Sequence, residues 1–145
     1  MGELIAVVSG KGGTGKTSVC AGLAAALAET GKQVLCVDCD GGLRNLDISL
    51  GMSECGSLSF LDVAEYGYEL ENAPKSSIYP TLSFLTAPMN RSPEEISTDS
   101  FIRLFRQARE RFDYIFLDAP AGVDAGFRLV CAAADRFLLV TGSGP

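Results

Sequence analysis

Short apolar runs recur along the chain, separated by longer stretches in which apolar residues return with a helical period. Five of these runs have the unbroken hydrophobic character of strands buried on both faces: residues 4–8, 34–37, 82–86, 114–117 and 137–140. Between them, apolar residues recur at intervals of three and four positions, which is the spacing of one helix face. The pattern therefore predicts an α/β domain with a mostly parallel sheet.

Turn and capping residues predict where two of the helices begin or end. An apolar helical face over residues 18–29 is followed by Gly31, in the position of a C′ glycine. Ser57 is the expected N-cap of a short helix that Gly67 ends. Glycine is expected just after the C-terminus of each of these two helices because it adopts left-handed backbone angles at no steric cost.

A second helix-start signal lies in the second half of the chain. Ser92 is the expected N-cap of a longer helix, with Pro93 at its first position and a glutamate at N3, and residues 97–100 could interrupt this helix. A further helix is expected around residues 127–131. Residues 69–80 are polar and contain proline, so we expect them to form a surface connection.

The composition fits one packed domain that spans residues 1–145. The chain is 47% hydrophobic and contains only 6 prolines, which argues against disorder. Its net charge of −6 disfavours non-specific binding of nucleic acid. Because histidine is absent, histidine-based catalysis and histidine metal sites are excluded. There is neither a signal-peptide pattern nor an apolar run as long as a membrane span, so we expect a cytoplasmic protein.

The chain has 5 cysteines, and their odd number and scattered spacing do not indicate a set of disulfides. Cys36 and Cys39 have the C-x-x-C spacing of redox and metal sites, but redox pairs of this kind normally lie at a helix N-terminus. Cys36 lies in a predicted strand, where residues three apart point to opposite faces. We therefore expect ordinary buried or loop thiols rather than a redox or metal pair.

A glycine-rich segment over residues 10–17 reads Gly-Lys-Gly-Gly-Thr-Gly-Lys-Thr and joins the first predicted strand to the first predicted helix. In that context G-x-x-x-x-G-K-[ST] is a phosphate-binding loop, because its backbone N–H groups and the positive helix end point at one anion. Lys16 supplies a cation for the outer phosphates, and Thr17 supplies a hydroxyl for Mg²⁺. A glycine turn without a ligand is the alternative, but such a turn does not need a Lys-Thr pair at that offset. The candidate nucleotide-binding residues of this segment are Gly10, Lys11, Gly12, Gly13, Thr14, Gly15, Lys16, Thr17 and Ser18.

Aspartates follow two of the predicted strands. Asp118 ends the fourth strand, in the Walker B position from which a carboxylate orients Mg²⁺ or its bound water. Asp38 and Asp40 bracket the end of the second strand, where they either hold metal-bound and attacking water or are solvated loop acids. The small residues after Asp118 either form a plain turn or move with a γ-phosphate, and Gly122 among them is a further nucleotide-binding candidate. Since ligands of parallel sheets bind beyond the carboxyl ends of the strands, we expect these residues to share one crevice.

Three segments, in the same order, resemble motifs of the MinD/ParA family of deviant Walker A ATPases. Residues 11–17 resemble its K-G-G-x-G-K-[ST] motif, residues 36–47 its switch I region, and residues 118–122 its switch II motif, D-x-P-A-G. The resemblance runs from residue 4 to around residue 142 and is closest to the MinD branch, whose members determine the septum site.

The resemblance implies a P-loop NTPase fold with helices on both faces of the sheet, and an ATPase that uses ATP and Mg²⁺ and dimerises around ATP. The residue matching Lys11 would reach the phosphates of the partner subunit and, with Lys16, belongs to the implied catalytic residues. Asp40 would position the hydrolytic water, and hydrolysis would be slow until a partner stimulates it. The implied metal ligands are Thr17, Asp38 and Asp118.

The resemblance also implies Min-type regulatory partners and a longer chain. We expect the C-terminal part of the family fold, with further strands, the adenine pocket and much of the dimer surface, to be missing from residues 1–145. Membrane contact is expected only through a C-terminal segment beyond these residues, at the inner face of the cell membrane. The strand at residues 137–140 is expected to form an uncovered sheet edge.

Other functions stay open at this point. A related plasmid-partition or flagellar-positioning ATPase is one alternative, although the string around Arg44 and the acidic charge argue against it. A nucleotide-binding remnant without turnover is another. A metabolic phosphotransferase is a weaker alternative, because no motif for an acceptor substrate is visible.

Overall fold

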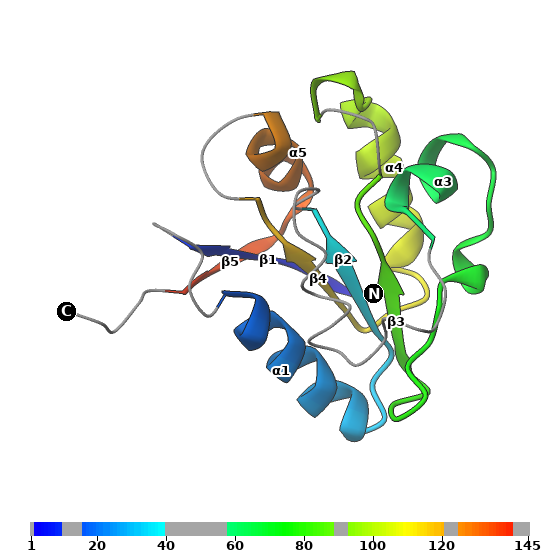
Figure 1. Cartoon of the computed structure of the whole chain (residues 1–145), viewed down its shortest axis with the longest axis vertical. Coiled ribbons are helices and arrows are strands. Elements are labelled where there is room, and N and C mark those ends of the chain that lie inside the picture. The colour runs from blue at the N-terminus through cyan, green and yellow to red at the C-terminus, as the bar shows by residue number, and fades with distance from the viewer. Residues whose placement is uncertain (1, 10–15, 40–57, 89–92, 121–124, 141–145) are drawn as a thin grey trace.

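The computed structural model describes residues 2–9, 16–39, 58–88, 93–120 and 125–140. Within them, five parallel strands form one sheet in the order β3-β2-β4-β1-β5 (Figure 1). The strands are β1 (Glu3–Ser9), β2 (Val34–Asp38), β3 (Leu82–Leu85), β4 (Tyr114–Asp118) and β5 (Arg136–Val140). Each strand overlaps one of the predicted apolar runs, so the predicted α/β fold with a parallel sheet is confirmed.

Helices cover both faces of the sheet (Figure 1), as predicted. The described α-helices are α1 (Lys16–Glu29), α3 (Phe60–Glu65), α4 (Thr98–Ala108) and α5 (Ala125–Ala133), with 3-10 turns η1 (Leu70–Asn72) and η2 (Pro93–Glu95). α1 lies on one face, and α3, α4 and α5 lie on the other. Among these helices, none combines the length and the apolar character that a membrane span needs.

The sheet separates two hydrophobic clusters. On one side, Cys20 and Ala24 of α1 pack in a cluster that includes Cys36 of β2. On the other side, Phe101 and Phe105 of α4 belong to the larger cluster. Every residue of β2 is buried because both of its faces are covered, which explains why the predicted strands read as unbroken apolar runs rather than as alternating ones.

The two predicted helix-ending glycines are confirmed, whereas the predicted serine cap is wrong by two residues. Gly31 and Gly67 follow α1 and α3 with positive φ angles of 93° and 77°. The N-cap of α3 is Ser59 instead of Ser57, which lies outside the described residues. The Ser59 hydroxyl accepts the Asp62 N–H at 3.1 Å, and the Asp62 carboxylate accepts the Ser59 N–H at 3.0 Å. Asp62 selects Ser59 as the cap because only a serine three residues earlier can form this reciprocal box.

The helix expected after Ser92 is divided in two. η2 covers Pro93–Glu95, and α4 begins after Ser97, whose hydroxyl accepts the Ser100 N–H at 3.2 Å. The predicted interruption over residues 97–100 is therefore the true start of α4. The serine hydroxyl competes there for a backbone N–H, which ends one helical segment and caps the next. Ser92 itself lies outside the described residues.

The connection over residues 69–80 is packed more deeply than its polar composition predicts. Leu70 of η1 and Ala73 are buried in the larger cluster. The same connection runs along the outer edge of β3, where the Ser76 N–H donates to the Leu82 carbonyl at 2.9 Å. It therefore covers one edge of the sheet.

Candidate functional site

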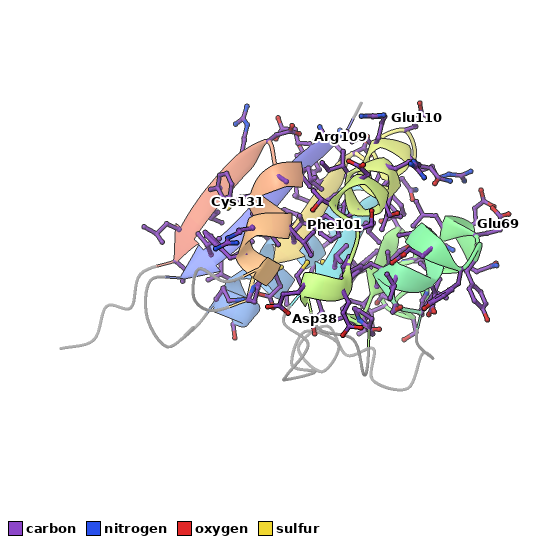
Figure 2. The ribbon with its side chains drawn as sticks, turned by 90° about the horizontal axis from the view of Figure 1, so that it is seen from above. Asp38, Glu69, Phe101, Arg109, Glu110 and Cys131 are labelled. Carbon is purple, nitrogen blue, oxygen red and sulfur yellow. The ribbon has the colours of Figure 1, made fainter. Side chains whose placement is uncertain are left out.

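The carboxyl ends of β1, β2 and β4 lie together at one end of the sheet, where Asp38 is labelled in Figure 2. In the parallel register, Asp118 lies between Asp38 of β2 and Val7 of β1. The backbone bonding continues past the strand ends, because the Cys39 N–H donates to the Asp118 carbonyl at 3.0 Å and the Ala119 N–H donates to the Val7 carbonyl at 3.1 Å. This bonding holds the ends of three strands together and brings the two predicted aspartates side by side.

Lys16, the first residue of α1, reaches the same strand ends. Its ammonium group forms an ion pair with the Asp118 carboxylate and donates a second hydrogen bond to the Ala119 carbonyl oxygen at 2.5 Å. The two charged side chains are only 5% and 4% exposed. A buried charge is strongly unfavourable unless it is paired, so the ion pair is what allows Lys16 and Asp118 to lie in the interior.

Asp38 adds a second buried carboxylate, 3% exposed, beside that of Asp118. Mg²⁺ prefers oxygen ligands and usually takes one or two protein carboxylates, with phosphate and water oxygens in its remaining positions. No group of three or more Asp, Glu, His or Cys side chains in the described ranges is placed to hold a metal by itself. The donor set therefore fits Mg²⁺ bound together with phosphates, and the Lys16 ammonium fits a phosphate oxygen.

The structure brings together Lys16, Asp38 and Asp118 from the predicted site. Ser18 lies in the first turn of α1 and its side chain is exposed, while Thr17 is described only in its backbone. The other candidates lie outside the described residues: Gly10, Lys11, Gly12, Gly13, Thr14, Gly15, Asp40 and Gly122.

Sequence reasoning missed two groups near the site. One is the carbonyl of Ala119, which shares the Lys16 ammonium with Asp118. The other is Cys20, one helical turn after Lys16, whose thiol hydrogen-bonds to that of Cys36. This hydrogen bond, followed by burial, raises the pKa of Cys20 well above its ordinary value, so the thiol keeps its proton and acts as an apolar core group. The spacing of four residues from Lys16 was the available sequence signal for Cys20, whereas backbone carbonyls carry none.

The C-x-x-C cysteines do not form a pair. Cys36 packs on the α1 side of the sheet, and Cys39 packs against the cluster on the opposite side. Neither cysteine forms a disulfide. The prediction that these two residues point to opposite faces of the sheet is confirmed.

The family follows from comparison with known proteins. Residues 5–123 match the family described as the CobQ/CobB/MinD/ParA nucleotide binding domain. The chain belongs to this family. The resemblance predicted from the three motifs is therefore confirmed, and the parallel sheet with helices on both faces is the P-loop NTPase fold of these proteins.

Individual relatives narrow the likeness to one branch of the family. The chain is 42% identical over 142 residues to the septum site-determining protein MinD of Synechocystis, a match that covers 97% of this chain and 53% of that protein. A chain of the MinC:MinD cell division protein complex of Aquifex aeolicus superposes with a TM-score of 0.81 at 35% identity, covering 94% of this chain and 55% of that one. MinD of Pyrococcus horikoshii complexed with Mg-ADP has a TM-score of 0.80 at 31% identity, covering 97% of this chain and 58% of that one. The chain thus spans about half the length of the curated relatives it matches.

Proposed function

We propose that residues 1–145 are the single-domain, N-terminal portion of a MinD-type ATPase that binds ATP with Mg²⁺, hydrolyses it and regulates placement of the division septum. One observation carries the proposal. Lys16, the lysine of the phosphate-loop motif, lies beside Asp118 and Asp38 where the carboxyl ends of the parallel strands meet. The septum site-determining relatives and the Mg-ADP bound to the Pyrococcus protein support the same function.

Each residue of the site has one task in this proposal. Lys16 binds an outer phosphate oxygen and offsets its negative charge. Thr17, Asp38 and Asp118 hold Mg²⁺, which when bound withdraws charge from the phosphate oxygens. Asp40 orients the attacking water in line with the bond between the γ-phosphorus and its leaving oxygen.

Lys11 extends the proposal to a second subunit. We infer an ATP-dependent homodimer in which Lys11 reaches the phosphates bound by the partner. Dimerisation would therefore depend on which nucleotide is bound. The MinC:MinD complex of Aquifex aeolicus supports Min-type regulatory proteins as partners. The whole protein would be cytoplasmic and peripheral to the inner face of the cell membrane, through a segment beyond residue 145. Nucleic acid is not an expected partner because the net charge is −6.

The first test of the proposal is nucleotide binding by Lys16→Ala. This variant is expected to lose binding of ADP and ATP in the presence of Mg²⁺, measured by calorimetry, because the phosphates lose their cation. Lys32→Ala is the matched control, since Lys32 is an exposed lysine just beyond the other end of α1. Equal affinity in wild type and Lys16→Ala, with both folded by circular dichroism, would contradict the proposed site.

A second test separates binding from turnover at Asp40. Asp40→Ala is expected to bind ATP as wild type does but to release no phosphate, because water orientation contributes to the transition state and not to nucleotide binding. Glu69→Ala, which removes an exposed carboxylate just before η1, is the control and should keep its turnover. Phosphate release by Asp40→Ala at the wild-type rate would remove Asp40 from this role.

A nucleotide-binding remnant without turnover is a second candidate function, because Lys16 with Asp118 and Asp38 supports binding of a nucleotide whether or not it is hydrolysed. The test measures phosphate release from this chain and from a version extended with the second half of the Synechocystis relative. Comparable rates would reject the remnant. Turnover confined to the extended version, with nucleotide binding in both, would support it.

A further inference from the structure

A small cavity lies at the end of the sheet opposite the candidate nucleotide site. Its volume is about 180 Å³, and its walls come from the residue before β2, from η1 and the connection after it, from β3 and from the segment after α4. Gln33, on its wall, directly precedes β2, whereas Asp38 is the last residue of that strand. The length of β2 separates these two positions by about 16 Å, so the cavity is distinct from the nucleotide site.

The Ser83 hydroxyl is a buried polar group on the wall of this cavity. Ser83 is 3% exposed and pairs in the register with Leu35, which belongs to the larger hydrophobic cluster. Within the part of the chain that the structure describes, no protein group is hydrogen-bonded to this hydroxyl. A buried hydroxyl without a partner is unfavourable, and an alanine in the same strand would avoid that cost. Ser83 therefore indicates a position at which a polar atom of a ligand can bind.

The charged groups of the cavity are two cations and one carboxylate. The Glu71 carboxylate is paired with the Arg111 guanidinium, and Lys75 supplies the second cation. The Lys75 ammonium donates one hydrogen bond, to the Glu71 carbonyl oxygen at 3.1 Å, and in the described ranges it forms no ion pair. Because an ammonium group has three N–H donors, two remain for a ligand. A ligand with one negative charge matches this balance.

The backbone directs Lys75 and Ser83 to the same ligand atom. The two residues face one another in an antiparallel bridge at the outer edge of the sheet. Side chains of residues directly opposite in such a pair lie on the same face, with their Cβ atoms about 5 Å apart. One carboxylate can therefore contact the ammonium and the hydroxyl together.

Apolar walls determine the size and character of the rest of the ligand. Leu70 is buried, Phe112 is half-buried against the larger cluster, and both line the cavity. An apolar cavity of about 150 Å³ holds benzene, so about 180 Å³ admits one ring with a small polar group. A nucleotide is too large, because sites for drug-sized ligands begin at about 300 Å³.

We propose that this cavity binds a small organic monocarboxylate whose apolar body is about the size of one ring. Its carboxylate pairs with Lys75 and accepts a hydrogen bond from the Ser83 hydroxyl, while its body packs against Leu70 and Phe112. The inference does not depend on the proposed function, because none of these residues belongs to the nucleotide site.

Wild-type protein gives the first test, through ¹H–¹⁵N spectra recorded while sodium benzoate is added. The backbone N–H signals of Glu71, Ser83 and Phe112 should shift and saturate, with a dissociation constant of about 1 mM or lower for a ligand of this size. The signal of Lys16 should not shift. Unshifted cavity signals at about 10 mM benzoate would overturn the proposal and leave water as the partner of Ser83. Shifts confined to Lys16 would overturn it as well, because benzoate would then be replacing a phosphate.

Benzamide, which has the same ring but no charge, tests the selection for a carboxylate. Benzoate should bind about tenfold more tightly than benzamide, because only the carboxylate forms an ion pair with the Lys75 ammonium. Equal affinities for the two compounds would overturn the proposal of a carboxylate site.

Lys75→Gln tests which cation is responsible. It should weaken benzoate binding about tenfold and leave benzamide binding unchanged. Lys32→Gln is the matched control, since Lys32 is an exposed lysine that does not line the cavity, and it should bind benzoate as wild type does. Equal weakening in the two variants would overturn the site in favour of a general effect of charge.

Ser83→Ala separates a binding role from a structural one. It should weaken benzoate binding about fivefold, yet without benzoate it should unfold at a temperature no lower than wild type, since the hydroxyl has no protein partner to lose. Ser77→Ala, at an exposed position outside the cavity, should change neither quantity. A lower unfolding temperature of Ser83→Ala together with unchanged benzoate affinity would assign the hydroxyl to the fold and overturn its role in binding.

Discussion

Arg109, which Figure 2 labels at the end of the molecule opposite Asp38, pairs with Asp135 and joins three segments. The Arg109 guanidinium contacts both oxygens of the Asp135 carboxylate, one of them at 2.8 Å, and also donates to the Ala133 carbonyl at 3.3 Å. The same carboxylate accepts the backbone N–H of Leu4 at 3.1 Å. One pair of residues therefore ties the end of α4 to the end of α5 and to the start of β1.

Neutralising Asp135 is expected to weaken the fold in a pH-dependent way. The hydrogen bond from Arg109, opposed by a smaller effect of burial, lowers the pKa of Asp135 below its ordinary value of 3.8. A carboxyl group whose pKa is lowered by folding stabilises the folded state above its unfolded pKa, and this contribution is lost as the pH falls through the folded pKa. Asp135→Asn should lower the free energy of unfolding at neutral pH by about 1 kcal/mol, because the partly exposed pair is screened by solvent. Urea denaturation at a series of pH values measures the difference.

Two observations decide whether the charge of Asp135 is responsible. The difference from wild type should shrink as the pH falls below 3.8, the ordinary pKa of the group. Glu110→Gln, which removes an exposed carboxylate next to Arg109 in the sequence, should stay within about 0.5 kcal/mol of wild type. A loss of stability in Asp135→Asn that persists unchanged into acid would show that packing, and not the ion pair, is affected.

The capping box of α3 is the clearest determinant at the scale of one element. α3 has only 6 residues, too few to be stable by propensity alone. Its first residue, Phe60, is buried and meets the ring of Phe101 edge-on, with ring centroids 5.3 Å apart. The box formed by Ser59 and Asp62 therefore fixes how α3 packs against α4.

Removing that cap should cost about 1 kcal/mol of stability in Ser59→Ala, because the Asp62 N–H at the third helical position loses its acceptor. Thermal and urea unfolding measure the loss. Ser77→Ala, at an exposed position of the connection before β3, is the matched control and should lie within about 0.5 kcal/mol of wild type. Equal losses in the two variants would show that the Ser59 hydroxyl contributes nothing specific.

Strands were easier to predict from the sequence than helix starts, for a physical reason. A parallel strand covered on both faces must be apolar throughout, so a continuous apolar run such as that of β2 predicts its position. Serines near a helix start are nearly equivalent by propensity, and tertiary packing chooses among them. The choice of Ser59 over Ser57 follows both the capping box with Asp62 and the burial of Phe60, and the choice of Ser97 over Ser92 follows the burial of Phe101.

The candidate site was predictable in its location but not in its contacts. Asp38 and Asp118 lie at the same end of the sheet because the carboxyl ends of parallel strands lie together, which is the general rule for parallel sheets. The ion pair of Lys16 with Asp118 depends on β4 lying between β1 and β2, and no local pattern encodes that order. The contact of Cys20 with Cys36 likewise depends on where α1 crosses β2.

At the scale of the whole molecule, the two edges of the sheet differ. Beyond β3, residues 74–76 cover the edge, where the Phe84 N–H donates to the Pro74 carbonyl at 3.0 Å. β5 is the other outer strand, and among the described strands it pairs only with β1. Its Phe137 and Leu139 are 50% and 60% exposed. An apolar edge strand of this kind is a template for pairing with another chain.

This chain is therefore expected to self-associate through β5 as its concentration rises. Phe137 and Leu139 pair with Ala6 and Val8 in the register. Because they are two residues apart, their side chains point to the same face of the sheet and form one apolar strip along β5. The double variant Phe137→Lys, Leu139→Lys should stay monomeric in sedimentation velocity at concentrations where wild type associates, because like charges on an edge oppose strand pairing. Ile78→Lys changes another apolar residue, 69% exposed and away from β5, and should leave the association unchanged. Loss of association in Ile78→Lys as well would indicate non-specific association through exposed apolar residues. Association that persists in the double variant would show that the contact is not made by β5.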